Sequence, residues 1–484
     1  MLRRSPLSAL VGSACLALAA GVAACEAPPP PSRGDAPEPA EALRPDEDRG
    51  SVPEEARIAD YVIDARLDAE THTITGSLRL TWRNRTRTPV RTLPFHLYMN
   101  GFRSEDTAWM REARGSHRGE RQEKDTKEGA WGTIDLSRIV ALGPPQPGGV
   151  QGGELRPGEP VPLSWAEDAD PSTMTATLPF EVGPEEAITV EIDFTTKLPK
   201  VFARTGYYKD FHMVGQWYPK IGVLDPIRGW QNHTFTYHSE FYADFGDYEV
   251  VLDVPAEMIV GATGILVGER ELPRGDDDEG GARKTLRYRA EMVHDFAWAA
   301  APDFVEVRSE WRGIRIRQLL APEYAGDADA HEAALVATLE SMDHRFGPYP
   351  WSTITVIHPP DGAGGAAGME YPTLFTSSPM LARSIWLRAF GLEERVSGLF
   401  TTIHEFGHQY FQGLLASDES REPWLDEGMN TFANALALAD WGRAGGGWAN
   451  GEGVLRLGAQ EVVESDLIRL ALLFYTDLDP VRSP

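Results

Sequence analysis

The first half of the chain alternates apolar and polar residues between turn signals. Residues 60–67, 72–82 and 94–98 place an apolar side chain at almost every second position, as half-buried strands do. Further strands are predicted at 187–194, 234–242, 248–254, 284–289 and 313–320. Many short strands separated by glycine and proline are typical of a β-sandwich. We therefore predict a β-rich N-terminal domain over residues 56–322.

The periodicity becomes helical near residue 330. Apolar residues recur at helical spacing over 331–346, and the segment ends at Gly347 before Pro348, which is a typical helix stop. Two short strands at 353–357 and 369–376, a long helix over 393–415 and a second helix from Glu427 through 438 are predicted next. The chain is thus predicted to be a multidomain α+β protein, with a mixed second domain over 323–484.

The N-terminus is typical of an export signal. Two arginines precede an apolar run over 7–20 that is too short to span a bilayer, and the VAAC sequence at 22–25 resembles a bacterial lipobox. We predict a lipoprotein signal peptide over 1–25 and lipidation of Cys25, which anchors the protein to a membrane facing the periplasm or the cell exterior. An ordinary secretory signal is the alternative, and both interpretations predict export.

Composition narrows the possible chemistry. The 73 acidic and 46 basic residues give a net charge of −27 without a basic patch, which argues against a nucleic-acid partner. Residues 26–55 are rich in proline, alanine and acidic side chains and are predicted to form a disordered linker. The only cysteines are Cys15, in the predicted signal, and Cys25. The mature domains therefore have no disulfide, and thiol catalysis and cysteine-ligated zinc are excluded.

A histidine pair within the long helix indicates metal chemistry. His404 and His408 stand four residues apart and share one helix face, so that both can reach one ion. Zinc peptidase sites often combine two histidines and one glutamate and leave a fourth position open for water, and Glu427 is the natural third ligand. Glu405 then acts as general base and passes the water proton to a leaving amine. The alternative is a helix whose histidines are only surface or core residues.

Both motifs resemble those of the M1 metallopeptidases, the aminopeptidase N-like gluzincins. The H-E-x-x-H motif is followed after eighteen residues by Glu427 within W-L-x-E-G. Upstream, the GGAAGMEYP sequence at 364–372 resembles the G-x-M-E-N element of that family, with Tyr371 in place of the asparagine and Ala367 in place of the first glycine.

The resemblance implies a fold and an activity. It implies an N-terminal saddle-like β-sandwich and a thermolysin-like zinc peptidase domain with one zinc ion per chain. It also implies peptide substrates bound by Gly368, Met369 and Glu370, in which Glu370 holds the free α-amine, as in an aminopeptidase. The family stabilises the oxyanion with a tyrosine well beyond the third zinc ligand, whereas only Tyr475 follows Glu427 here, at a shorter spacing. We therefore leave Tyr475 unassigned and expect the catalytic domain to be incomplete, with that tyrosine beyond Pro484.

Several alternatives follow from the same residues. The protein is a zinc endopeptidase if it cleaves peptides with blocked N-termini, or an inactive zinc-containing peptide-binding module if the missing tyrosine is essential. Residues 216–219 (QWYP) either line the first side-chain pocket or belong to the core. Asp426 is either a partner of a zinc-bound histidine or an exposed acid at a helix N-terminus. The acidic run at 276–279 is predicted to be a solvated turn rather than a calcium site.

Overall fold

The computed structural model describes residues 52–113, 131–143, 146–147, 160–237, 241–272, 281–377, 395–443, 455–457 and 460–462. The predicted signal peptide with Cys25, the acidic run at 276–279 and Tyr475 lie outside the described residues. Among the helices that are described, none is both long and apolar enough to cross a membrane.

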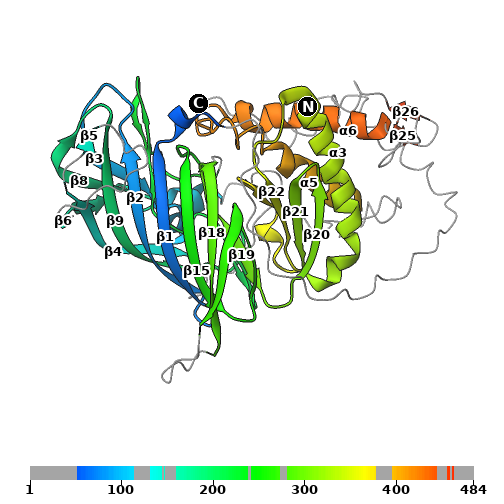
Figure 1. The fold of residues 1–484 in the computed structure, drawn as a ribbon, viewed down its shortest axis with the longest axis horizontal. Helices are drawn as coiled ribbons and strands as arrows, with labels where there is room; N and C mark the ends of the chain where they lie inside the picture. The colour runs from blue at the N-terminus through cyan, green and yellow to red at the C-terminus, as the bar shows by residue number, and fades with distance from the viewer. Residues whose placement is uncertain are drawn as a thin grey trace, which may run out of the picture.

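One large sheet forms the framework of the first half (Figure 1). The strand order is β17-β18-β15-β1-β2-β9-β4-β6, with β5 also paired to β9. Neighbours are antiparallel except β1 and β15, which run parallel. The strands are β1 (Ala59–Asp68), β2 (Thr73–Arg83), β4 (Thr133–Leu142), β5 (Gln146–Pro147), β6 (Pro160–Pro162), β9 (Glu186–Lys197), β15 (Gly246–Pro255), β17 (Ile265–Leu272) and β18 (Arg283–Val293). Residues of β1 and β2 alternate between buried and accessible, which confirms the period-two pattern of the sequence.

Smaller sheets share a hydrophobic core with the large one. Their strand orders are β12-β3-β8-β7, β10-β11-β19-β16 and β13-β14. Trp82, Trp217 and Trp298 are fully buried in this core. The elements are η2 (Glu54–Ala56), β3 (Val90–His96), η3 (Tyr98–Phe102), α2 (Ala108–Glu112), β7 (Ser164–Glu167), β8 (Thr173–Val182), β10 (Gly206–Tyr208), β11 (Phe211–Val214), β12 (Lys220–Ile221), β13 (Val223–Asp225), β14 (Gly229–Gln231), β16 (Ile259–Ala262) and β19 (Trp298–Ala301).

The predicted strand over 234–242 is wrong for its described part, 234–237 and 241–242, which belongs to no strand. Phe235 instead packs edge-on against Tyr98, with ring centroids 5.2 Å apart. The Phe235 amide donates to the hydroxyl of Ser172 at 3.0 Å. A side chain therefore satisfies this backbone donor in place of a strand partner, and the Phe235 ring packs among aromatic side chains of the core.

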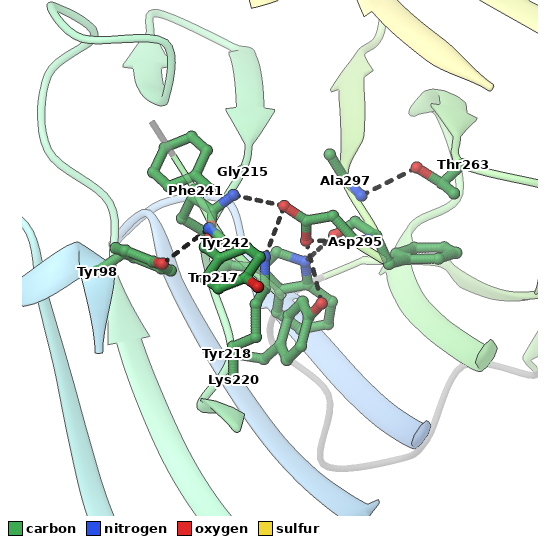
Figure 2. Close-up of polar contacts among 12 residues, drawn as sticks. Tyr98, Gly215, Trp217, Tyr218, Lys220, Phe241, Tyr242, Thr263, Asp295 and Ala297 are labelled. Carbon is green, nitrogen blue, oxygen red and sulfur yellow. Dashed lines mark hydrogen bonds and ion pairs between the residues drawn. The ribbon is translucent and has the colours of Figure 1, made fainter. Parts of the chain in front are cut away.

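A buried ion pair lies at the centre of this half. Lys220 Nζ lies 2.7 Å from Asp295 Oδ2, and the two side chains are 1% and 4% exposed. The Tyr218 hydroxyl donates to Asp295 at 3.0 Å, and the Gln216 amide donates to the same carboxylate (Figure 2). Because Gln216, Trp217 and Tyr218 are all buried, residues 216–219 belong to the core rather than to a substrate pocket.

Replacing one partner of this pair is expected to destabilise the protein strongly. Lys220→Met leaves the Asp295 carboxylate buried without a counter-charge, which costs about 3–5 kcal/mol of unfolding free energy. Urea unfolding measures the loss, and the double variant with Asp295→Leu is expected to recover much of it. A loss below about 1 kcal/mol in the single variant contradicts the assignment of a buried charge pair.

In its described residues, the second half contains a five-stranded sheet, the two-stranded sheet β25-β26 and three helices, α3, α5 and α6, that pack together. The strand order is β20-β21-β22-β24-β23; β21, β22 and β24 are parallel, and β23 is the antiparallel strand at one edge. Helices α3, α5 and α6 contact one another, and α5 also contacts β23 and β24. The elements are β20 (Val305–Trp311), β21 (Ile314–Leu320), η4 (Pro322–Asp327), α3 (Ala328–Phe346), β22 (Thr353–His358), η5 (Gly364–Ala366), β23 (Met369–Tyr371), β24 (Leu374–Thr376), α5 (Arg395–Gly407), η6 (Trp424–Gly428), α6 (Met429–Arg443), β25 (Leu455–Leu457) and β26 (Gln460–Val462).

Two predicted elements of this half differ from the structure. The single strand over 369–376 is a tight hairpin of β23 and β24, turned at Thr373, whose φ is +60°. The helix predicted over 393–415 ends at Gly407 within the described residues. A Cβ atom at Gly407 would lie 2.1 Å from Asn430 Oδ1, so this glycine permits the close approach of α6.

Candidate metal and substrate site

Helix α5 and the π-helical turn η6 present the predicted metal ligands. His404 and Glu405 lie in the last turn of α5, and the His408 amide still donates to the His404 carbonyl at 3.2 Å. The helical geometry therefore continues through His408 and keeps both imidazoles on one face. Glu427 lies in η6, an element of the kind often found at functional sites.

The three ligand atoms form a triangle that fits one zinc ion. His404 Nε2 lies 3.2 Å from His408 Nε2 and 3.2 Å from Glu427 Oε2, and the third side of the triangle is 3.7 Å. Tetrahedral zinc with ligands at its usual bond lengths separates them by about 3.3 Å. Two imidazole Nε2 lone pairs that face each other at this distance repel unless a proton or a metal ion lies between them. The residues present therefore fit a zinc ion.

Polar side chains contact the opposite nitrogens of both histidines. His408 Nδ1 lies 2.5 Å from Asp426 Oδ1, and both side chains are almost fully buried. His404 Nδ1 lies 3.0 Å from the amide of Asn434, while the Asn430 amide donates to the His404 carbonyl at 2.8 Å. At His408, a proton held on Nδ1 by the Asp426 carboxylate leaves Nε2 free as a metal ligand. Asp426 is therefore the partner of His408 and not an exposed acid at a helix terminus.

The electrostatics of this group favour a cation. Burial lowers the pKa of His408, but the charges of Asp426, Glu370 and Glu427 outweigh burial and raise it well above its usual range. Burial raises the pKa of Asp426 to about 7, although the charge of His408 opposes the rise. In the absence of metal, His408 is therefore protonated, and its positive charge takes the place of the metal ion among these acids.

Removing the charge of Asp426 is expected to weaken metal binding. Asp426→Asn keeps the size of the side chain but removes its negative charge. The neutral amide holds the proton on His408 Nδ1 less strongly than the carboxylate does. The zinc dissociation constant is expected to rise about 10- to 100-fold, measured by competition with a chromophoric chelator. An unchanged constant is the outcome that contradicts this role.

Glu405 is buried directly beside the triangle. It is 5% exposed, and its Oε2 has no hydrogen-bond partner in the described part of the chain. Burial is the main cause that raises its pKa well above the usual range, and the Glu370 charge adds to it. A carboxyl group with a raised pKa takes up a proton readily, as a general base requires.

The β23–β24 hairpin brings the predicted substrate residues to the same place. Carboxylate oxygens of Glu370 and Glu405 and a nitrogen of His408 lie within 4.8 Å of one another. Gly368 precedes β23 with a φ of +71°, and a Cβ atom there would lie 3.4 Å from Glu405 Oε1. Met369 is buried beside them. The structure therefore brings together all seven predicted site residues.

Gln409 positions the hairpin and was not singled out by the sequence analysis. Its Oε1 accepts from the Thr373 amide at 2.7 Å, and its Nε2 donates to the Tyr371 carbonyl at 2.9 Å. The side chain is 1% exposed. Because Gln409 follows His408 directly, it fixes the strand of Glu370 relative to the metal ligands. Its position next to H-E-x-x-H is the only signal that the sequence offers.

Comparison with known proteins gives matches among solved structures only. No family model matches the chain, and no curated protein does. An M1 zinc metallopeptidase from Deinococcus radiodurans is 15% identical with a TM-score of 0.48, covering 78% of this chain and 69% of that one. A two-domain M1 zinc metallopeptidase mutant bound to L-arginine is also 15% identical, with a TM-score of 0.49 and coverages of 81% and 71%. Both are M1 zinc metallopeptidases, the family that the sequence motifs resemble.

Proposed function

We propose that this chain is a zinc-dependent metallopeptidase of the M1 type that removes N-terminal residues from peptides. The observation that carries the proposal is the ligand triangle of His404, His408 and Glu427, whose sides of 3.2–3.7 Å suit one zinc ion. Glu405 and Glu370 lie directly beside it. A helix with two incidental histidines explains neither the triangle nor the buried acids around it.

Glu405 is proposed to move the proton. Bound zinc supplies a water of lowered pKa, about 7 in such sites. Glu405 accepts a proton at its buried carboxylate and later delivers it to the leaving amine. Among the described residues no group bonds to its Oε2, which leaves a lone pair available for that purpose. Burial excludes bulk water, which strengthens each electrostatic interaction of the carboxylate.

Glu370 and its strand are proposed to bind the substrate. Residue Glu370 is 8% exposed, so a charge-assisted hydrogen bond from an α-ammonium to its carboxylate is formed largely away from bulk water. Strand β23 lies at the edge of its sheet, where a peptide backbone can add as a further strand. We propose that this arrangement is the substrate strand of a thermolysin-like catalytic domain, joined to a saddle-like N-terminal sandwich.

Two other functions use the same residues. An endopeptidase requires the metal site but does not require Glu370 to hold an ammonium, so the burial of Glu370 next to Glu405 favours the aminopeptidase. An inactive zinc-containing binding module requires the ligands but has no use for Glu405. The complete set of ligands, base and amine-binding acid therefore favours a peptidase active on free N-termini.

Peptides with a free or an acetylated N-terminus distinguish these three functions experimentally. We expect the zinc-loaded chain to hydrolyse aminoacyl-arylamides and free peptides from the N-terminus, and to leave their N-acetylated forms intact. Product masses over time give the cleavage site. Cleavage of the acetylated peptides identifies an endopeptidase, and bound zinc without hydrolysis of either form identifies a binding module.

A further inference from the structure

A polar cavity of about 200 Å³ is lined by residues from both halves of the chain. One wall comes from the end of β14 and the residues that follow it, and the other comes from the segment between α5 and η6. No proposed metal ligand or substrate residue lines the cavity. The lining residues include Trp230, Asn232 and His233 from the first half and Asp418, Ser420 and Arg421 from the second.

The wall from the first half carries buried polar atoms without a partner. Trp230 Nε1, both polar atoms of the Asn232 amide and both ring nitrogens of His233 have no hydrogen-bond partner among the described residues. His96 is fully buried with its ring centroid 5.2 Å from that of His233, and its two ring nitrogens are unpaired within the same part of the chain. Buried polar groups of natural proteins are hydrogen-bonded to protein, water or ligand. A polar ligand therefore suits this wall.

The opposite wall presents an acid and a base that are held in place. One oxygen of the Asp418 carboxylate accepts from the Ser420 hydroxyl at 2.6 Å, and the other lies 3.2 Å from Arg421 Nε. The Arg421 amide donates to the Asp418 carbonyl at 3.1 Å. Within the described residues, the Arg421 guanidinium pairs with an acid through Nε alone, so that both Nη groups remain for a ligand. The Arg421 side chain is 55% exposed, which gives a ligand access from solvent.

These groups have the chemistry that recognises an α-amino acid. The Nη groups of Arg421 and the indole N–H of Trp230 suit a carboxylate, because a guanidinium binds a carboxylate through two parallel hydrogen bonds. The Asp418 carboxylate suits an ammonium group. Burial lowers the pKa of His233, so that its neutral ring donates through one nitrogen and accepts through the other. A ligand with a single charge gives a new partner to Asp418 or to Arg421, but not to both.

The volume of the cavity limits the size of the ligand. Its 200 Å³ is roughly seven times the volume of about 30 Å³ that one water molecule occupies in the liquid. Sites for drug-sized molecules have about 300–1,000 Å³. A single amino acid therefore fits the cavity, whereas a peptide of several residues is too large.

We propose that this cavity binds one free α-amino acid, with the carboxylate on Arg421 and the ammonium group on Asp418. The bound amino acid contacts both halves of the chain. It also holds the segment that leads into η6, which carries Asp426 and Glu427. The inference goes beyond the proposed peptidase function and does not depend on it.

Calorimetry with L-leucine on the zinc-loaded full chain carrying Glu370→Gln tests the proposal. That substitution removes the acid proposed to hold an α-ammonium at the active site, so that one leucine per chain is expected to bind, at the cavity. L-leucinamide lacks the carboxylate and 4-methylpentanoate lacks the ammonium group, and each is expected to bind at least about tenfold more weakly.

Substitutions at Arg421 locate the bound leucine. Adding Arg421→Gln is expected to weaken leucine binding at least about tenfold, and Arg421→Lys, which keeps the charge but not the paired hydrogen bonds, is expected to weaken it less. Because the Arg421 side chain is 55% exposed, both variants are expected to keep the thermal unfolding midpoint of the parent chain. Arg228→Gln is the matched control, since Arg228 is exposed between β13 and β14 and does not line the cavity, and it is expected to leave binding unchanged.

Three results overturn the proposal. The absence of leucine binding means that water alone fills the cavity. Unchanged binding in Arg421→Gln places leucine elsewhere on the chain, and equal binding of 4-methylpentanoate rules out recognition of the ammonium group by Asp418. None of these measurements requires turnover, so a failure of arylamide hydrolysis refutes the proposed function and leaves this inference to be decided by the calorimetry.

Discussion

Glu405→Gln is expected to lower kcat/KM for an aminoacyl-arylamide about 10²- to 10⁴-fold, the range that a general acid–base residue contributes. The amide of glutamine keeps the shape of the side chain but cannot accept the proton. Glu405 is not part of the ligand triangle of His404, His408 and Glu427, so zinc content is expected to stay near one ion per chain. Steady-state kinetics and metal analysis on the same preparation give both quantities.

Glu422→Gln is the matched control for this experiment. It removes one carboxylate from the same half of the chain, at a half-buried position, and both activity and zinc content are expected to remain unchanged. Activity of Glu405→Gln within about threefold of the natural chain would refute the role of Glu405 as the base. Loss of zinc from that variant would instead place Glu405 among the ligands.

Glu427→Gln is expected to remove both metal and activity. Glu427 Oε2 lies 3.2 Å from His404 Nε2 and 3.7 Å from His408 Nε2. Its negative charge is also one of those that raise the pKa of His408 and favour a cation at the site. An amide oxygen is a poorer ligand for zinc than a carboxylate, so zinc content after dialysis is expected to fall well below one ion per chain, with hydrolysis falling in proportion. Metal analysis before and after dialysis checks the first effect.

Excess zinc distinguishes a lost ligand from a misfolded variant. Glu427→Gln is expected to regain part of its activity at high zinc concentration and to keep the thermal unfolding midpoint of the metal-free natural chain. A variant that retains one zinc ion and full activity after dialysis rules out Glu427 as the third ligand.

A local pattern in the sequence is sufficient for the two histidine ligands, whereas Glu427 is identified by the downstream motif that contains it. The four-residue spacing of His404 and His408 places both on one helix face whatever surrounds the helix, and the structure brings Glu427 to them. The alternation over 60–67 and 72–82 likewise predicts strands that the structure contains as β1 and β2. These features depend on residues that are close in sequence, where periodicity is informative.

Periodicity does not predict features that depend on tertiary contacts. Helix α5 ends at Gly407, where the glycine permits the close approach of Asn430 on α6, whereas periodicity alone extends that helix to 415. The role of Gln409 depends on two backbone groups of a hairpin more than thirty residues earlier. His233 and Arg421 lie in polar, irregular segments, and only the folded chain brings them to one cavity.

Titration of the metal-free chain with zinc tests the central claim most directly. Metal is removed with a chelator, zinc is added in steps, and hydrolysis of leucyl-arylamide is followed at each step. We expect activity to rise in proportion to zinc and to level off at about one ion per chain, as one zinc ion bound by His404, His408 and Glu427 requires. Full activity in the metal-free chain, or binding of one zinc ion without any hydrolysis, contradicts the proposed zinc aminopeptidase.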